Sequence, residues 1–152
     1  MPRNPPPDDV VIPALLRGAR GSYAQSIRAE LVAGGFDDLP RNGAFVLGGM
    51  ANHDGPAVDM IRGLGVTKQA ASQLIDTLVL RGYLVRDVNP DDRRRMTIEL
   101  TERGRAAALA IEAGTRAIDA QLSAMITSAQ MSGLRVGLAA LAEIKEKTED
   151  DA

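Results

Sequence analysis

The chain has 152 residues, with 18 Lys and Arg against 20 Asp and Glu, so its formal net charge is −2. Apolar residues make up 45% and charged residues 25%, which is ordinary for one folded domain or one domain with an appended helical segment. With no Cys and only one His, the chain excludes a structural zinc site, a disulfide and a cysteine nucleophile. We therefore expect no metal and no cofactor. The lone His53 could sense pH or a metal, but a lone His beside a loop is more often simply exposed.

The apolar runs are only a few residues long, so we expect no membrane span. The first residues, MPRNPPPDD, are rich in Pro and differ from the apolar core of a signal peptide. We therefore expect a cytoplasmic protein.

The chain begins with an arm and continues into an amphipathic helix. Residues 1–8 contain four Pro, which predicts an extended segment. From about Val10 the pattern is helical, and Gly34 and Gly35 end it. Apolar residues at spacings of seven, four and four form one stripe of this helix: Leu16, Tyr23, Ile27 and Leu31.

A second helix is predicted over residues 40–51, with Pro40 near its start. Its large side chains available for burial are Phe45, Val46 and Met50. Gly48 and Gly49 inside it cost about 1 kcal/mol each relative to Ala. Either they leave room for a ligand or they let another backbone pack closely, and the sequence leaves both alternatives open.

The next elements form a helix, a tight turn and a helix. Asp54-Gly55-Pro56 predicts a loop, and a short helix follows over about residues 57–64. Gly65 ends it, and Thr67 is the natural N-cap of a longer helix that runs to Arg81 and Gly82. This order is that of a helix-turn-helix.

Four hydrogen-bonding side chains share one face at the start of the longer helix: Lys68, Gln69, Ser72 and Gln73. The opposite face carries Ala71, Leu74, Ile75 and Leu78 and is expected to pack inward. Such a polar face suits base edges and phosphates. Taken alone, however, it fits a solvated surface helix better.

A β-hairpin predicted next changes that balance. Residues 84–88 and 96–100 are predicted as strands, and Asn89-Pro90-Asp91-Asp92 forms a turn. The second strand alternates, with Met96, Ile98 and Leu100 on one face. The tip carries Arg93, Arg94 and Arg95. An arginine cluster on a projecting ribbon suits a narrow minor groove, although a polar turn also needs charge for solubility. A helix-turn-helix followed by such a hairpin is typical of a winged helix.

Two long helices complete the chain. Thr101 is expected to cap the first, which runs to about Ser128, and Ser132 to cap the last, which carries Leu134, Leu138 and Leu141. The aromatic content is only two Phe, two Tyr and no Trp, and the first, fifth and last helices carry apolar stripes. These features predict an obligate homodimer with an interface above ~2,000 Å². The fold class is mainly α with a small β-hairpin wing, a winged helix-turn-helix with flanking dimerisation helices.

The stretch GLGVTKQAASQLIDTLVLRGYLVRDVNPDDRRRMTIELTERG, residues 63–104, resembles the DNA-binding lobe of the MarR family of bacterial transcription regulators. The matching motifs are Leu-Gly-Val before the longer helix, Arg-Gly-Tyr-Leu-Val-Arg at its end, Asp-x-Arg in the wing and Leu-Thr-x-x-Gly after it. About 40 residues match closely, while the flanking helices match in number, order and apolar pattern.

The resemblance implies a homodimer on a pseudo-palindromic operator in double-stranded DNA. It divides the chain into an arm at 1–8, a dimerisation region at 9–35 and 101–148, and a DNA-binding lobe at 36–100. It assigns base contacts to Lys68, Gln69, Ser72 and Gln73 and a place near the phosphates to Thr67. Arg94 would be the wing-tip arginine, oriented by Asp92, with Arg93 and Arg95 at phosphates or in solvent.

The most consistent function is a DNA-binding repressor that a small apolar or aromatic effector releases. The effector pocket is expected between the dimerisation helices and the lobe, near Tyr23, Phe45, Gly48 and Gly49. Gly48-Gly49 and Asp54-Gly55-Pro56 depart from the usual family pattern near this place. The alternatives are a winged-helix module for protein–protein contact without DNA binding and, more distantly, an enzyme, for which no catalytic motif is found.

Overall fold

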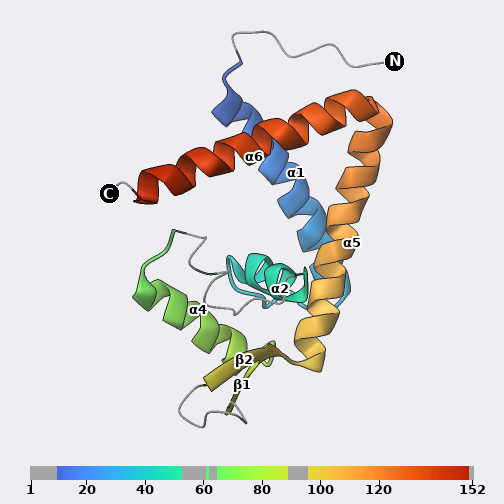
Figure 1. Ribbon diagram of the computed structural model, residues 1–152. Coiled ribbons are helices and arrows are strands. Elements are labelled where there is room, and N and C mark those ends of the chain that lie inside the picture. Colours follow the sequence, from blue (N-terminus) through green and yellow to red (C-terminus); the bar gives the residue numbers. More distant parts are fainter. Residues whose placement is uncertain (1–9, 53–60, 62–64, 89–95, 151–152) are drawn as a thin grey trace.

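The computed structural model describes residues 10–52, 61, 65–88 and 96–150, without the side chains of Met96 and 145–150. The helices in this part are α1 (Ile12–Ala33), α2 (Gly43–Asn52), α4 (Lys68–Leu80), α5 (Glu102–Met125) and α6 (Ser128–Asp150). Strands β1 (Leu84–Val88) and β2 (Met96–Leu100) form an antiparallel hairpin (Figure 1). The fold class predicted from the sequence, mainly α with a hairpin wing, is confirmed.

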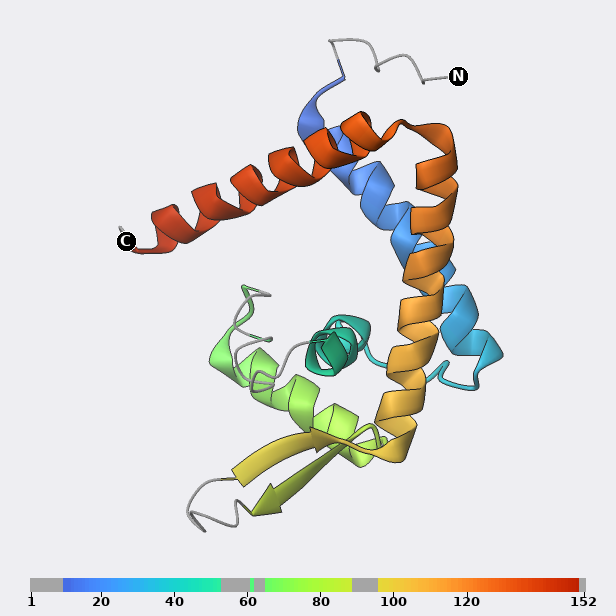
Figure 2. The same ribbon diagram turned by 45° about the vertical axis from the view of Figure 1, so that its right-hand side comes forward.

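Helix α5 is a long helix that connects the hairpin at one end of the molecule with α6 at the other. It starts beside the hairpin and ends where α6 turns away, and α1 lies along its upper part in both views (Figures 1 and 2). The two helices cross at Gly114, where an added Cβ would lie 2.6 Å from the Cα of Ile27. The hydroxyl of Ser26 donates to the carbonyl of Gly114 at 2.8 Å. The absence of a side chain at Gly114 therefore sets how closely α1 and α5 pack.

The core lies in the lobe formed by α2, α4 and the hairpin against α5. Its most deeply buried side chains are Tyr83, Leu47, Ile61, Leu78, Leu84 and Val46. Leu31 of α1 and Ile111 of α5 join the same cluster. The predicted stripe of α1 faces this side, since Leu31 is buried and Leu16, Tyr23 and Ile27 are half-buried.

Helix α2 starts later than predicted. Residues 40–43 form a turn in which the amide of Gly43 donates to the carbonyl of Pro40 at 2.8 Å, and Asn42 has a φ of 66°. The helix therefore begins at Gly43 and reaches Asn52. Val46 is buried as expected, but the burial expected for Phe45 is wrong, because this side chain is 51% exposed.

The boundary between the last two helices also differs from the prediction. Helix α5 ends at Met125, and α6 begins at Ser128 rather than at the predicted cap Ser132. Thr127 forms a capping box with Gln130: its hydroxyl accepts from the Gln130 amide at 3.3 Å, and the Gln130 side chain accepts from the Thr127 amide at 2.9 Å. Two orphan amides are satisfied there, so the cap lies five residues earlier than predicted.

Several predicted features lie outside the described residues. They are the arm at 1–8, His53, the loop at 54–56, the helix at 57–64 apart from Ile61, and the wing tip with Asp92, Arg93, Arg94 and Arg95. In the part of the chain that the structure describes, no helix is long and apolar enough to cross a membrane.

Candidate nucleic-acid interface and adjoining cavity

Helix α4 presents the polar face that its sequence predicts. The Thr67 hydroxyl accepts from the amide of Ala70 at 3.1 Å, which confirms Thr67 as the N-cap. The side chains of Lys68, Gln69, Ser72 and Gln73 are all exposed, whereas Ile75 and Leu78 are buried. The first two turns of α4 thus offer donors and acceptors to an external partner while the other face anchors the helix in the lobe.

The hairpin is tied directly to α4. Gly82, with a φ of 75°, turns the chain at the end of the helix, and the amide of Tyr83 donates to the carbonyl of Leu78 at 2.9 Å. Further along, the guanidinium of Arg86 on β1 pairs with the carboxylate of Asp76 on α4. The strands pair from Leu84 with Leu100 to Val88 with Met96.

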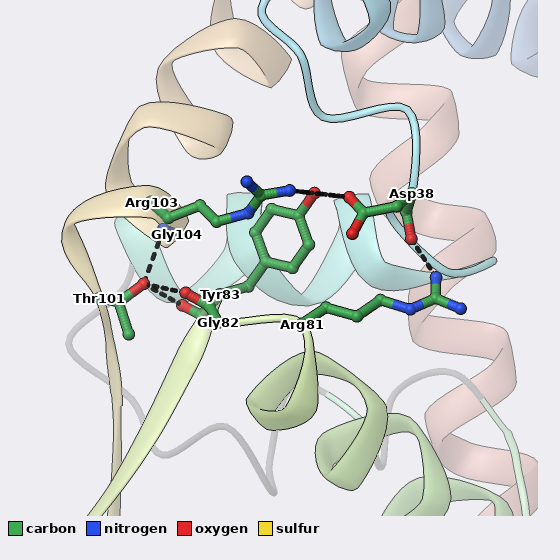
Figure 3. Close-up of polar contacts among 7 residues, drawn as sticks. All are labelled: Asp38, Arg81, Gly82, Tyr83, Thr101, Arg103 and Gly104. Atoms are coloured by element: carbon green, nitrogen blue, oxygen red, sulfur yellow. Dashed lines mark hydrogen bonds and ion pairs between the residues drawn. The ribbon is translucent and has the colours of Figure 1, made fainter.

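The start of α5 is fixed at the base of the hairpin (Figure 3). The Thr101 hydroxyl accepts from the amide of Gly104 at 3.0 Å, which confirms the predicted cap, and lies 2.5 Å from the carbonyl oxygen of Gly82. A Cβ at Gly104 would lie 2.0 Å from the carbonyl oxygen of Tyr83. The Leu-Thr-x-x-Gly motif therefore packs the start of α5 closely against the turn after α4.

Asp38 and three side chains around it join the α1–α2 connection to this base, and we call Asp38, Arg81, Tyr83 and Arg103 the Asp38 cluster (Figure 3). The Tyr83 hydroxyl donates to the Asp38 carboxylate, and Nη2 of Arg103 donates to the same oxygen at 2.9 Å. The Arg81 guanidinium donates to the Asp38 backbone carbonyl. One residue of the connection thus contacts the end of α4, the start of β1 and the start of α5.

Hydrogen bonding and burial fix the charges in this cluster. The hydrogen bond from Tyr83, followed by that from Arg103, lowers the pKa of the Asp38 carboxyl. Burial, followed by the hydrogen bond to Asp38, raises the pKa of the Tyr83 phenol. The donor therefore keeps its proton and the acceptor keeps its charge around neutral pH.

A cavity of about 1060 Å³ lies between α1, α2 and α5. The four residues expected near an effector, Tyr23, Phe45, Gly48 and Gly49, all line it. At Gly48 an added Cβ would lie 3.4 Å from Ile111, so the helices approach here without touching backbone to backbone. Gly48 therefore packs in ordinary van der Waals contact with α5, and both Gly48 and Gly49 line the cavity.

Two polar features of the cavity were not predicted. The Tyr23 hydroxyl donates to the Asp119 carboxylate at 2.5 Å, and this bond, followed by burial, raises the pKa of Tyr23. Three arginines also line the cavity, Arg20, Arg28 and Arg41, with Asp37 as the one acidic residue among the lining. Asp119 is 96 residues from Tyr23, so no local pattern could have paired them. Arg20 and Arg28 flank Tyr23 in the sequence, however, and could have indicated a basic lining.

Within the described residues, no group of three or more His, Asp or Glu side chains could hold a metal ion. The arrangement is instead a helix with an outward polar face, a hairpin beside it and a cavity at the junction with the long helices. It defines a winged helix-turn-helix protein of the kind that binds nucleic acid.

Comparisons with known proteins agree with this class. Residues 37–95, from the α1–α2 connection to the wing, match the model of the MarR family. No protein of curated function matches the sequence closely enough to count as a relative.

Three solved structures share the architecture over most of the chain. CouR from Rhodococcus jostii RHA1, bound to p-coumaroyl-CoA, is 26% identical with a TM-score of 0.68, over 89% of this chain and 92% of its own. The S. aureus MepR–DNA complex is 20% identical with a TM-score of 0.70, over 89% and 98%. The MarR family transcription regulator SP03579 is 22% identical with a TM-score of 0.69, over 93% and 89%.

Residues 37–95 are therefore similar to the MarR family of transcription regulators, as the sequence motifs predict. Regulators of this family are generally not enzymes.

Proposed function

We propose that this chain is a dimeric, sequence-specific DNA-binding repressor whose affinity for its operator is lowered by a small molecule. The observation that carries this proposal is the exposed polar face of α4, held by the Thr67 cap at one end and by the hairpin at the other. We assign the chain no catalytic role, and we place its action in the cytoplasm with the DNA.

In this proposal α4 enters the major groove and the wing reaches the backbone or the minor groove. Gln69 and Gln73 each carry an amide that can bond N6 and N7 of an adenine together, and Lys68 can reach a phosphate. The predicted wing-tip Arg94, oriented by Asp92, would read the width of the minor groove. The MepR structure bound to DNA has the same fold.

Apolar surface on α6 and at the start of α1 supports the dimer. Leu134, Leu138 and Leu141 lie on one face of α6 and are each 42% exposed. Val11 and Ile12 at the start of α1 are more exposed still. Exposed apolar side chains on one helix face are typical of protein–protein contacts, and a second copy presenting the same helices would cover them. We retain 9–35 and 101–148 as the dimerisation region and 36–100 as the DNA-binding lobe.

The cavity is our candidate effector site. Its apolar part suits an acyl or aromatic body, and its three arginines against one aspartate suit an acidic group on the ligand. CouR is bound to p-coumaroyl-CoA, which has an aromatic body and acidic phosphates. We therefore propose a small aromatic acid or its thioester as the effector class.

Sequencing the DNA that the purified protein selects from a random pool tests the function. We expect a pseudo-palindrome with two half-sites about one helical turn apart. Weak binding without enriched sequence would overturn the proposal and favour a protein-contact module.

A further inference from the structure

The connection between α1 and α2 has two sides that serve different parts of the molecule. Six of its seven residues from 36 to 42 line the cavity: Phe36, Asp37, Leu39, Pro40, Arg41 and Asn42. The remaining residue, Asp38, is absent from the cavity wall and makes the contacts of the Asp38 cluster. The wall of the candidate effector site and the anchor of the wing are therefore one short segment.

The contacts of Asp38 reach each element that sets the position of the DNA-contacting surface. Arg81 is the C-cap residue of α4, and Tyr83 immediately precedes β1. Arg103 is in the first turn of α5, which starts directly after β2. A shift of Asp38 would therefore act on α4, the hairpin and α5 together.

A second contact runs from the cavity wall into the same cluster. The guanidinium of Arg103 lies 5.7 Å from the ring centre of Phe36 and 4.7 Å from that of Tyr83. The two rings are 6.3 Å apart and tilted by 58°. Phe36 lines the cavity, so a ligand that moves this ring also disturbs the partners of Asp38.

We propose that Asp38 is a positioning residue that couples occupation of the cavity to the orientation of α4 and the hairpin. This inference rests on the proposed function, because it assigns the route by which the effector site acts on DNA binding. An effector shifts the equilibrium only if the two states hold it with different affinity. In this proposal the wall residues on either side of Asp38 differ in position between the two states, and Asp38 transmits that difference to its partners.

A double-mutant cycle tests the coupling without a known ligand. Ala24→Phe places an aromatic ring in the cavity from α1, and Ala113→Phe adds the same ring at an exposed site of α5 outside the lining. Each is combined with Asp38→Asn and with Tyr83→Phe, which keeps the buried ring and removes only its hydroxyl. Arg116→Ala, which breaks the Arg116–Glu112 pair on α5, is the matched charge control.

Two readouts are measured on folded variants: the operator Kd and amide hydrogen exchange over residues 68–88. We expect Ala24→Phe to change the operator Kd and the exchange rates by about five-fold or more in the unmodified protein and in Arg116→Ala. In Asp38→Asn and Tyr83→Phe we expect the same ring to change them by less than about two-fold. Ala113→Phe should leave both unchanged in every background.

An equal response to Ala24→Phe in all backgrounds would overturn the role of Asp38, as would no response in the parent. Failure of every variant to bind DNA would count against the proposed function alone, because hydrogen exchange reports the coupling without DNA.

Discussion

The DNA-binding lobe and the C-terminal helix α6 differ in how well a single chain buries their apolar side chains. In the lobe, Leu47, Leu78 and Tyr83 are fully buried, and both ends of α4 are fixed. In α6, the apolar side chains from Leu134 to Leu141 remain exposed, and its C-terminal part runs past α1 with no other element beside it in either view (Figures 1 and 2). The described part of the lobe thus buries a core of its own, whereas the apolar face of α6 from Leu134 to Leu141 stays exposed in one chain.

The largest effect should come from a charge on the apolar face of α6. Leu141→Asp places a carboxylate in the dimer contact of both subunits, and we expect the dimer to lose at least about 4 kcal/mol. Sedimentation equilibrium measures this loss. Val136→Asp is the control, since Val136 is 67% exposed and lies on the opposite side of the helix from Leu134. Equal weakening by both variants would show that this face does not form the interface.

Glycine substitutions separate packed from open helix surface. At Gly114 a new Cβ would lie 2.6 Å from the Cα of Ile27, so Gly114→Ala must push α1 and α5 apart. We expect a loss of about 1–3 kcal/mol in the free energy of unfolding, measured in urea. At Gly18 nothing lies within 4 Å, and Gly18→Ala should gain up to about 1 kcal/mol through helix propensity. A loss at Gly18 as large as that at Gly114 would contradict this packing.

The N-cap of α4 gives a smaller and more local effect. Thr67→Ala removes the hydrogen bond to the Ala70 amide and should cost about 1 kcal/mol of stability. Thr67→Ser keeps the hydroxyl and should recover most of the loss. Hydrogen exchange at residues 68–72 checks that the change is confined to the first turn, and a change spread evenly over α5 would count against it.

The Asp38 carboxylate should give the smallest effect, visible in the pH dependence of unfolding. Its pKa is lowered in the folded state, so its contribution is present above the unfolded pKa and is lost as the pH falls through the folded pKa. Asp38→Asn should therefore destabilise at pH 7 and less in acid. Asp37→Asn, with no hydrogen bond among the described residues, is the matched control. An unchanged pH profile in Asp38→Asn would contradict the ionised carboxylate.

Local signals in the sequence predicted the parts of the molecule that local chemistry determines. Thr67 and Thr101 cap their helices as expected, and the alternation of Met96, Ile98 and Leu100 predicted the second strand. The start of α6 was missed although Thr127 and Gln130 form a recognisable capping box. The Thr127–Gln130 capping box is a local sequence signal, and it predicts the start of α6 better than Ser132 does.

The Asp38 cluster and the Tyr23–Asp119 pair could not be predicted from spacing. The hydrogen bonds of Asp38 and of Tyr23 join residues that are between 43 and 96 positions apart in the chain. Only the packing of α1 on α5 and of the α1–α2 connection on the hairpin brings them together. Helical periodicity did predict the outward face of α4, because its residues follow one another within two helical turns.

The central claim, that the polar face of α4 reads bases and the wing binds the minor groove, is tested most directly by operator titration at several salt concentrations. Gln69→Ala should cost about 1–3 kcal/mol at the selected operator, relax preference at particular base pairs and leave the salt dependence unchanged. Arg94→Ala should weaken binding to most sequences and reduce the log–log salt slope by up to about one unit. Gln121→Ala, at an exposed site of α5, should change neither. Unaltered affinity, specificity and salt slope in both Gln69→Ala and Arg94→Ala would contradict the account.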